Sequence, residues 1–304
     1  MRKFLLKTCL FLLPVLVLLV AVEAYMRSLP NAYRYKEEWM WQNGERVSSL
    51  LFGNSHGYFG LVPSAMGDSV FNLCSVSQRA REDFYLLQRY ASACPHLRTV
   101  VLVVDNSNLF DVPMEDEEPF RVTYYQLYMG ARNHSPFSRY GFEISSMEAC
   151  IGKWKKYREM GGMGCDSLGW GTAYRYDNRN KAALNEENVR PHVFNSWEAT
   201  LVNTRNVKAI AKWCQQRHVR LVLLQMPVCE AYYQKMSSMQ RDYISSLADA
   251  CQQEYGALPA DFSQCEQLSD DDFFDADHLN DVGTKRFSRL LVDWCADHNV
   301  YICK

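Results

Sequence analysis

Short apolar runs and helical repeats alternate along the chain. The apolar runs at 48–53, 69–73, 99–104, 219–224 and 257–262 predict strands. The run 99–104 is continuously apolar and β-branched, which is typical of a parallel strand covered on both faces. Apolar residues at helical spacing predict helices over 81–93, 199–217, 232–254 and 281–298. Strands that alternate with helices predict an α/β fold, with three α/β/α layers around a mostly parallel sheet.

The alternation breaks between about residues 110 and 197. This stretch is rich in Tyr, Gly, Arg and Asn, and we interpret it as an insertion that is helical in part between 145 and 160. Its aromatic residues and arginines suit stacking against sugar rings, but they could equally form a cap that packs over the sheet edge. The residues concerned are Tyr124, Tyr125, Tyr128, Trp170, Tyr174 and Tyr176, with Arg132, Arg175 and Arg179. Among them, Trp170 and Tyr174 are our candidates for substrate binding.

The first two dozen residues have the pattern of a membrane helix. Arg2, Lys3 and Lys7 flank or precede an apolar run over 8–22, and residues 4–25 approach the ~20 needed to span a bilayer. The triplet at 22–24, Val-Glu-Ala, is a poor signal-peptidase site, so we expect an uncleaved anchor over 1–26, with a signal peptide as the alternative. The basic N-terminal side predicts a single-pass protein of a bacterial inner membrane, with everything after the anchor in the periplasm. Cleavage would instead give a secreted protein.

The length of 304 residues suits one large domain, which we place at 47–304 after a linker at 27–46. A formal net charge of -2 gives no overall basic field, so we expect no nucleic-acid partner.

There are eleven Cys, but no C-x-x-C and no Cys/His ligand spacing, so no zinc site is expected. An oxidising compartment would permit disulfides such as Cys295–Cys303 or Cys150–Cys165, whereas buried free thiols fit the sequence equally well.

Candidate chemistry lies in turns that follow the predicted strands. In parallel sheets, ligands bind at the carboxyl ends of the strands. The turn Gly53-Asn54-Ser55-His56-Gly57 places a serine at that edge, although serine in such a turn is also a common cap residue.

A second group precedes the last predicted helix, where Asp275 lies three residues before His278. A serine nucleophile needs a base, and the base needs an orienting carboxylate, so this loop could supply both. We expect Asp277 to face solvent or bind backbone, with the alternative that it replaces Asp275 as the orienting carboxylate. A solvated acidic loop, or a cation site that includes Asp270, Asp271 and Asp272, is the alternative.

A third group, Asp105-Asn106-Ser107-Asn108, ends the clearest strand. An Asn side chain of this group could donate to an oxyanion, although a plain turn is the alternative.

Together these segments resemble the SGNH/GDSL hydrolase superfamily, which has a flavodoxin-like fold. The resemblance covers 48–109 and 199–304 but not the insertion. It implies Ser55 as the nucleophile, His278 and Asp275 as base and acid, and the Ser55 N–H, Gln78 N–H and Asn108 amide as oxyanion donors. Gln78 stands where the superfamily has Gly, and His56 directly after the serine resembles membrane-anchored proteins of exopolysaccharide and cell-wall acylation systems.

The resemblance implies a serine esterase or O-acyltransferase without cofactor or metal. Its substrate would be an acyl ester, above all acetyl, of an envelope polysaccharide, or a small ester, and a multi-spanning membrane acyltransferase is the implied partner. His56 could shape the turn or contact substrate. The change to Gln78 motivates the alternative of a non-catalytic carbohydrate-binding or envelope assembly protein. A metal-dependent phosphoesterase would need a second ligand cluster, which the sequence does not offer.

Overall fold

The computed structural model describes residues 1–131, 141–161 and 163–302. These residues divide into two compact units. One is made of Met1–Glu37 and Glu115–Met163, and the other of Glu38–Met114 and Gly164–Lys304. We call them the helical unit and the sheet unit and describe each by itself.

The sheet unit contains a five-stranded parallel sheet in the order β2-β1-β3-β4-β5. Every strand that the sequence predicts is present. In β3 all residues from Thr99 to Val103 are buried, as expected for a parallel strand with both faces covered. The strands are β1 (Ser49–Phe52), β2 (Val70–Asn72), β3 (Thr99–Val103), β4 (Arg220–Gln225) and β5 (Leu258–Asp261).

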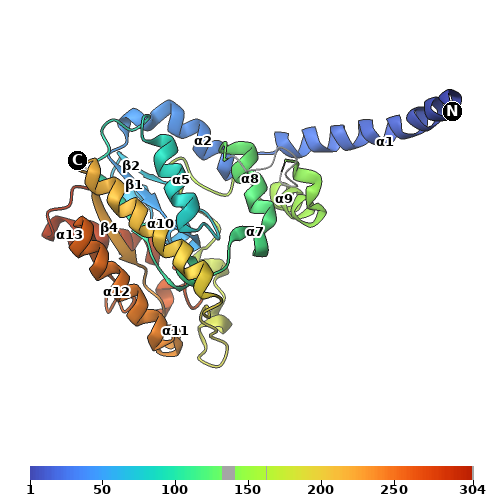
Figure 1. The fold of residues 1–304 in the computed structure, drawn as a ribbon. Coiled ribbons are helices and arrows are strands. Elements are labelled where there is room, and N and C mark those ends of the chain that lie inside the picture. Colours follow the sequence, from blue (N-terminus) through green and yellow to red (C-terminus); the bar gives the residue numbers. More distant parts are fainter. Residues whose placement is uncertain (132–140, 162, 303–304) are drawn as a thin grey trace. The chain divides into compact units, whose positions relative to one another are not determined.

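Helices cover the sheet on both faces, which confirms the predicted three-layer α/β/α fold. The helices α5 (Ala80–Tyr90), α10 (Trp197–Gln216) and α12 (Ser238–Tyr255) form one layer, in which α10 contacts the other two. Figure 1 shows α10 and α12 in front of the strands. On the other side, α13 (Gly283–Asp297) packs against α3 (Ser55–Gly60) and α4 (Pro63–Met66). The predicted helix over 232–254 is interrupted, because α11 ends at Lys235 and α12 begins at Ser238.

The segment expected to be a linker is largely helical. Helix α2 spans Ala32–Asn43, and its Trp39 ring stacks on Phe71 of β2 with ring centroids 3.9 Å apart. Met40 of the same helix is fully buried. The aromatic residues that looked like a spacer therefore serve as packing groups. The remaining helices are α6 (Asn106–Phe110), α7 (Met114–Glu117), α11 (Glu230–Lys235), η1 (Gly44–Arg46), η3 (Tyr176–Asn178), η4 (Lys181–Leu184) and η5 (Asp270–Asp272).

The helical unit contains α1 (Arg2–Ser28), α8 (Pro119–Tyr128), η2 (Glu143–Ser145) and α9 (Met147–Met160). Helix α9 matches the helix predicted inside the insertion. Helix α1 is long and apolar enough to cross a membrane, and an N-terminal signal sequence meets the same test. Its large apolar side chains from Phe4 to Val22 are exposed.

The cysteines that the structure describes include buried free thiols at Cys94, Cys150, Cys214, Cys229 and Cys251. Because Cys150 is a free thiol, it forms no disulfide with Cys165. Cys303, the other partner that was considered for Cys295, lies outside the described residues, as does Arg132.

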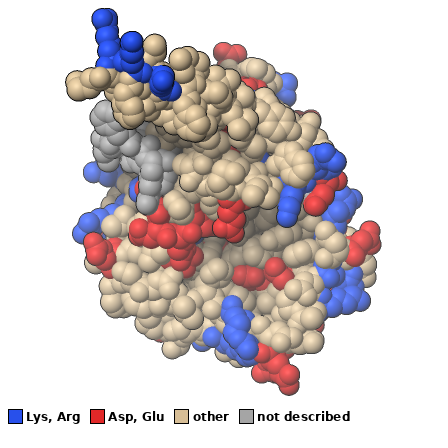
Figure 2. Space-filling view, turned by 90° about the vertical axis from the view of Figure 1, so that its right-hand side faces the viewer, with Lys and Arg blue, Asp and Glu red and all other residues tan. Residues whose placement is uncertain are grey.

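Lys and Arg side chains are scattered over the face drawn in Figure 2, whereas Asp and Glu side chains (red) gather near its middle. Lys and Arg side chains (blue) lie among acidic and uncharged ones there, and those that the structure describes on this face form no continuous basic patch.

Candidate active site

The turn after β1 brings Ser55 to the carboxyl edge of the sheet. Gly53 has φ of 135°, and a Cβ at this position would lie 2.6 Å from the Cβ of Val103. Only glycine fits such a sharp turn beside β3. The Gly53 N–H donates to the Asp83 carboxylate at 3.0 Å, and Ser55 then begins α3. Ser55 is half-buried, whereas the rest of α3 is buried.

Asn54 fixes the turn from the inside. Its Oδ1 accepts the His56 N–H at 3.0 Å and so caps α3. Its Nδ2 donates to both carboxylate oxygens of Asp105, at 2.9 and 3.0 Å, and to Ser107 Oγ. An aspartate in this place would repel Asp105, whereas the Asn54 amide donates to it.

The loop before α13 brings His278 against Ser55. His278 Nε2 lies 2.9 Å from Ser55 Oγ, although the two residues are 223 positions apart. His278 Nδ1 lies 2.9 Å from Asp275 Oδ1, and the same oxygen accepts the His278 backbone N–H at 2.9 Å. The structure therefore brings the three predicted catalytic side chains together in the order hydroxyl, imidazole and carboxylate.

Asp277 does not face solvent as expected. Its Oδ1 lies 3.2 Å from His278 Nδ1, and its Oδ2 lies 3.2 Å from His56 Nε2. The side chain is only 14% exposed. Asp277 thus connects the two imidazoles, and the Nδ1 of His278 is shared between two carboxylates.

His56 lies beneath this arrangement and does not reach a substrate. Its Nδ1 lies 2.6 Å from Asp105 Oδ2 and its Nε2 faces Asp277, while its side chain is 3% exposed. Both ring nitrogens therefore face carboxylates of the chain, as expected of a residue that shapes the turn. The His56 ring meets the His278 ring edge-on, with centroids 4.6 Å apart.

The charges of this cluster set its protonation states. Burial alone would lower the pKa of His56, but the negative charge of Asp105, together with hydrogen bonds to Asp105 and Asp277, raises that pKa well above its usual value. Burial would raise the pKa of Asp105, yet the charge of His56 holds it well below its ordinary range. Both carboxylates thus favour the protonated form of His56.

The pKa of His278 is raised to about 9. Burial opposes this shift, but the charge of Asp277 and the hydrogen bonds to Asp275 and Asp277 outweigh it, and the nearby His56 reduces it. His278 is therefore protonated at neutral pH and becomes a free base only in alkaline solution.

The two predicted oxyanion donors outside the serine turn are engaged elsewhere. The Gln78 N–H donates to Ser75 O at 3.1 Å, and Gln78 is fully buried. Asn108 Nδ2 donates to Val103 O at 2.6 Å, while its Oδ1 accepts the Asp105 N–H at 3.0 Å in a capping box. The Gln78 N–H and one N–H of the Asn108 amide therefore satisfy local backbone. The Ser55 N–H remains, in the first turn of α3, where N–H groups have no partner within the helix.

Aromatic rings surround the imidazole of His278. Tyr174 stacks between Phe59 and Phe274, with centroids 3.8 and 4.0 Å away, and meets the His278 ring edge-on at 5.1 Å. Trp170 Nε1 donates to Phe59 O at 2.8 Å, so this indole ties the segment before Tyr174 to α3. Tyr174 thus borders the site, and Trp170 holds it in place.

His192 opens this cluster to the surface. Its Nε2 lies 3.6 Å from Asp277 Oδ2, its Nδ1 lies 3.9 Å from Asp111 Oδ2, and its side chain is 41% exposed. Arg79 Nη2 is 3.3 Å from the same Asp111 oxygen. Sequence reasoning missed His192, Asp111 and Arg79. Asp105 could have been found from its place after β3, but nothing in the sequence marks His192.

A metal ion could be held at the spacing of His56, Asp277 and His278, whose ligand atoms lie within 4.8 Å of one another. We assign no metal here, because these atoms already face hydrogen-bond partners in the site.

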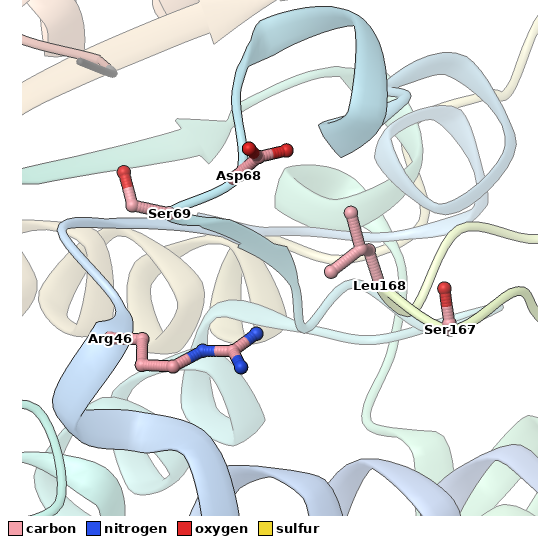
Figure 3. A pocket seen from close by; sticks show the side chains of 5 residues that line it. All are labelled: Arg46, Asp68, Ser69, Ser167 and Leu168. Atoms are coloured by element: carbon pink, nitrogen blue, oxygen red, sulfur yellow. The ribbon is translucent and has the colours of Figure 1, made fainter.

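The open pocket in Figure 3 does not contain the cluster. It measures about 570 Å³ and lies near the amino ends of β1 and β2, with Arg46 reaching across it toward Leu168 and Ser167. Asp68 and Ser69 complete its lining. Because Ser55 lies beyond the carboxyl end of β1, we place the chemistry at the hydroxyl-imidazole-carboxylate contacts and not in this pocket.

Comparisons with known proteins do not name a family. No family model matches the chain, and no curated protein matches it. Among solved structures, a Streptococcus pneumoniae protein that carries the name platelet activating factor is similar, with a TM-score of 0.43 and 12% identity. The match covers 94% of this chain and 98% of the other. At this level of similarity the site must be argued from its own atoms.

Proposed function

We propose that the protein is a serine ester hydrolase or O-acyltransferase with Ser55 as its nucleophile. The observation that carries this proposal is the 2.9 Å contact between Ser55 Oγ and His278 Nε2, with Asp275 and Asp277 behind the Nδ1 of the same ring. A hydroxyl next to an oriented imidazole is the arrangement that activates serine toward an ester carbonyl.

The reaction follows from these contacts. Ser55 Oγ attacks the carbonyl carbon while His278 Nε2 takes the hydroxyl proton. The tetrahedral intermediate collapses, the bond to the leaving oxygen breaks, and His278 returns the proton to that oxygen. Water or a sugar hydroxyl then attacks the acyl-serine carbonyl while His278 takes its proton. The second tetrahedral intermediate collapses, the bond from the acyl carbon to Ser55 Oγ breaks, and His278 returns the proton to Oγ. Asp275 and Asp277 stabilise the imidazolium in both steps.

The Ser55 N–H is the oxyanion donor that this geometry supports. It lies in the first turn of α3, beside the attacking hydroxyl, at the positive end of the helix. In this proposal the Gln78 and Asn108 groups keep the turns in shape instead of binding the oxyanion.

For the substrate we propose acyl esters, above all acetyl esters, on an envelope polysaccharide. The aromatic border formed by Phe59, Tyr174 and Phe274 suits sugar faces. We further propose that α1 anchors the chain in a bacterial inner membrane with the sheet unit in the periplasm. A multi-spanning acyltransferase is the proposed partner. The resemblance to acylation proteins and the apolar α1 support these points.

The test is a comparison of Ser55→Ala with Ser64→Ala, since Ser64 is an exposed serine of α4. Loss of p-nitrophenyl acetate turnover and of fluorophosphonate labelling in S55A alone is expected. If S55A still reacts with the fluorophosphonate, Ser55 is not the nucleophile.

A second candidate is a carbohydrate-binding protein without catalysis on the same fold. The observation that favours it is that the Gln78 N–H and the Asn108 amide both donate to backbone carbonyl oxygens. It predicts that acetylated glycan binds S55A and His278→Ala as tightly as wild type, with no turnover by any of the three.

A further inference from the structure

Helix α9 presents an apolar stripe to its surroundings. Met147, Ile151 and Trp154 are 61%, 49% and 40% exposed. They stand at positions i, i+4 and i+7 of the helix, so their side chains share one face. Phe142, shortly before α9, is 58% exposed. A continuous apolar stripe on a surface helix marks an interaction site more often than scattered single residues do.

A neighbouring face of α9 is packed against the end of α1. Cys150 forms a buried cluster with Met26 and Leu29, and Tyr157 packs against that cluster. Lys153 Nζ donates to Met26 O at 2.9 Å. These contacts all lie within the helical unit, so α9 is fixed to the last turns of α1.

The end of α1 is also fastened by a carboxylate. Glu23 accepts the N–H groups of Glu143 and Ile144, at 3.1 and 3.0 Å, and the Arg27 Nε at 2.5 Å. A carboxylate next to an apolar helix is costly unless it is paired in this way. Glu23 is buried, whereas the apolar side chains that precede it, up to Val22, are exposed. The packed part of α1 therefore begins where its exposed apolar part ends.

We propose that the α9 stripe lies in the head-group region of the bilayer that α1 crosses. Met26, which contacts α9, is four residues from Val22, or about 6 Å along the helix, so the stripe begins close to the point where α1 leaves the hydrocarbon. An interfacial helix that carries Trp on its apolar face and basic residues beside it is typical of such a position.

The charges of α9 point to an anionic lipid surface. Lys155, Lys156 and Arg158 are exposed, and the Arg158 guanidinium lies 5.4 Å from the Trp154 ring centroid. Basic side chains near a membrane surface are attracted to anionic lipids. The occupant of the stripe is thus a phospholipid surface. This proposal does not depend on the chemistry of Ser55.

The experiment uses the full chain reconstituted in vesicles of phosphatidylglycerol and phosphatidylcholine, with or without bromine on the acyl chains near the head group. Bromine quenches tryptophan emission on contact. Because the chain has seven Trp, the Trp154 signal is obtained as the difference between wild type and Trp154→Phe. Trp197 of α10, which is 50% exposed in the sheet unit, gives the matched difference with Trp197→Phe.

We expect brominated lipid to remove a large part of the Trp154 emission and to leave the Trp197 emission unchanged. Ile151→Glu, at a half-exposed position, should reduce the quenching of Trp154 without lowering the unfolding temperature. Equal Trp154 emission in brominated and unbrominated vesicles, in protein that sediments with the vesicles, would overturn the proposal. The stripe would then be a binding surface for a protein partner instead of for lipid. If the protein did not sediment with the vesicles, α1 would not be a membrane anchor and the proposal would be wrong. Esterase activity would be unaffected by that result.

Discussion

The sharing of one ring nitrogen by two carboxylates leads to a quantitative prediction. Asp275 Oδ1 and Asp277 Oδ1 lie 2.9 and 3.2 Å from His278 Nδ1. In a triad with one aspartate, its replacement by asparagine costs about 10⁴-fold in rate, because the imidazole then adopts the wrong tautomer. Here either carboxylate alone can still accept the Nδ1 proton.

We therefore expect D275N and D277N each to lower the pH-independent kcat by about 10- to 100-fold, or about 1.4–2.7 kcal/mol of barrier. The double variant should approach the loss of about 10⁴-fold. D275N should be the more damaging single change, since Asp275 also accepts the backbone N–H of His278 at 2.9 Å.

The pH dependence gives the second readout. The base acts in its deprotonated form, so kcat/KM should rise with pH through the His278 pKa of about 9. The charge of Asp277 is the largest influence that raises this pKa, so in D277N the rise should move to lower pH. At neutral pH this shift increases the fraction of free base and offsets part of the lost rate.

The assay is p-nitrophenyl ester hydrolysis over a pH series, corrected with S55A for spontaneous hydrolysis. Asp271→Asn is the matched control, because Asp271 is a carboxylate of the same loop with 75% exposure. The reasoning is refuted if D277N alone loses about 10⁴-fold with an unchanged unfolding temperature, or if its rate rises at a higher pH than that of wild type.

Three further predictions concern the groups around the nucleophile. Asn108→Ala should destabilise the fold by about 1 kcal/mol in denaturant unfolding, because the α6 capping box is lost, and it should change kcat less than tenfold. A 10²- to 10³-fold loss of kcat would instead show that Asn108 is an oxyanion donor. Burial raises the pKa of Asp83 from 3.8 to about 8, so between these pH values the folded state holds a proton that the unfolded chain releases, and the free energy of unfolding falls as pH rises. In Asp83→Asn, the free energy of unfolding measured at a series of pH values should fall less steeply. An unchanged fall would contradict the assignment. Gly53→Ala should lower the free energy of unfolding by about 2–4 kcal/mol in the same assay and should lower esterase activity, because the new Cβ would contact Val103 at a positive φ. A variant as stable as wild type would show that the turn can relax.

The sheet could be predicted from sequence because its strands are short, continuously apolar and buried on both faces. The proximity of Ser55 and His278 could be predicted as well, since strand topology places both at one edge. What a pattern cannot give is the partner of a side chain. Asn108 was expected at an oxyanion, but its amide is used by the backbone of its own turn, as short polar side chains often are.

The buried His56 illustrates the same limit. Its partners Asp105 and Asp277 come from segments that are 49 and 221 residues away, so no local spacing reveals that it is held between them. The helix inside the expected linker at 27–46 was missed for a related reason. Trp39 looks like part of a polar spacer until Phe71 of β2 is placed beneath it.

The fastening of α1 by Glu23 bears on how the protein can be produced. A shortened version that starts after Ser28, as is common when a water-soluble sample is wanted, would lack the acceptor for the Glu143 and Ile144 N–H groups and the Met26 side chain beside Cys150. Such a sample would contain an opened helical unit with newly bared apolar surface, and its tendency to aggregate would say little about the native chain. Detergent or nanodisc preparations that keep residues 1–28 are therefore the appropriate material for biochemical work.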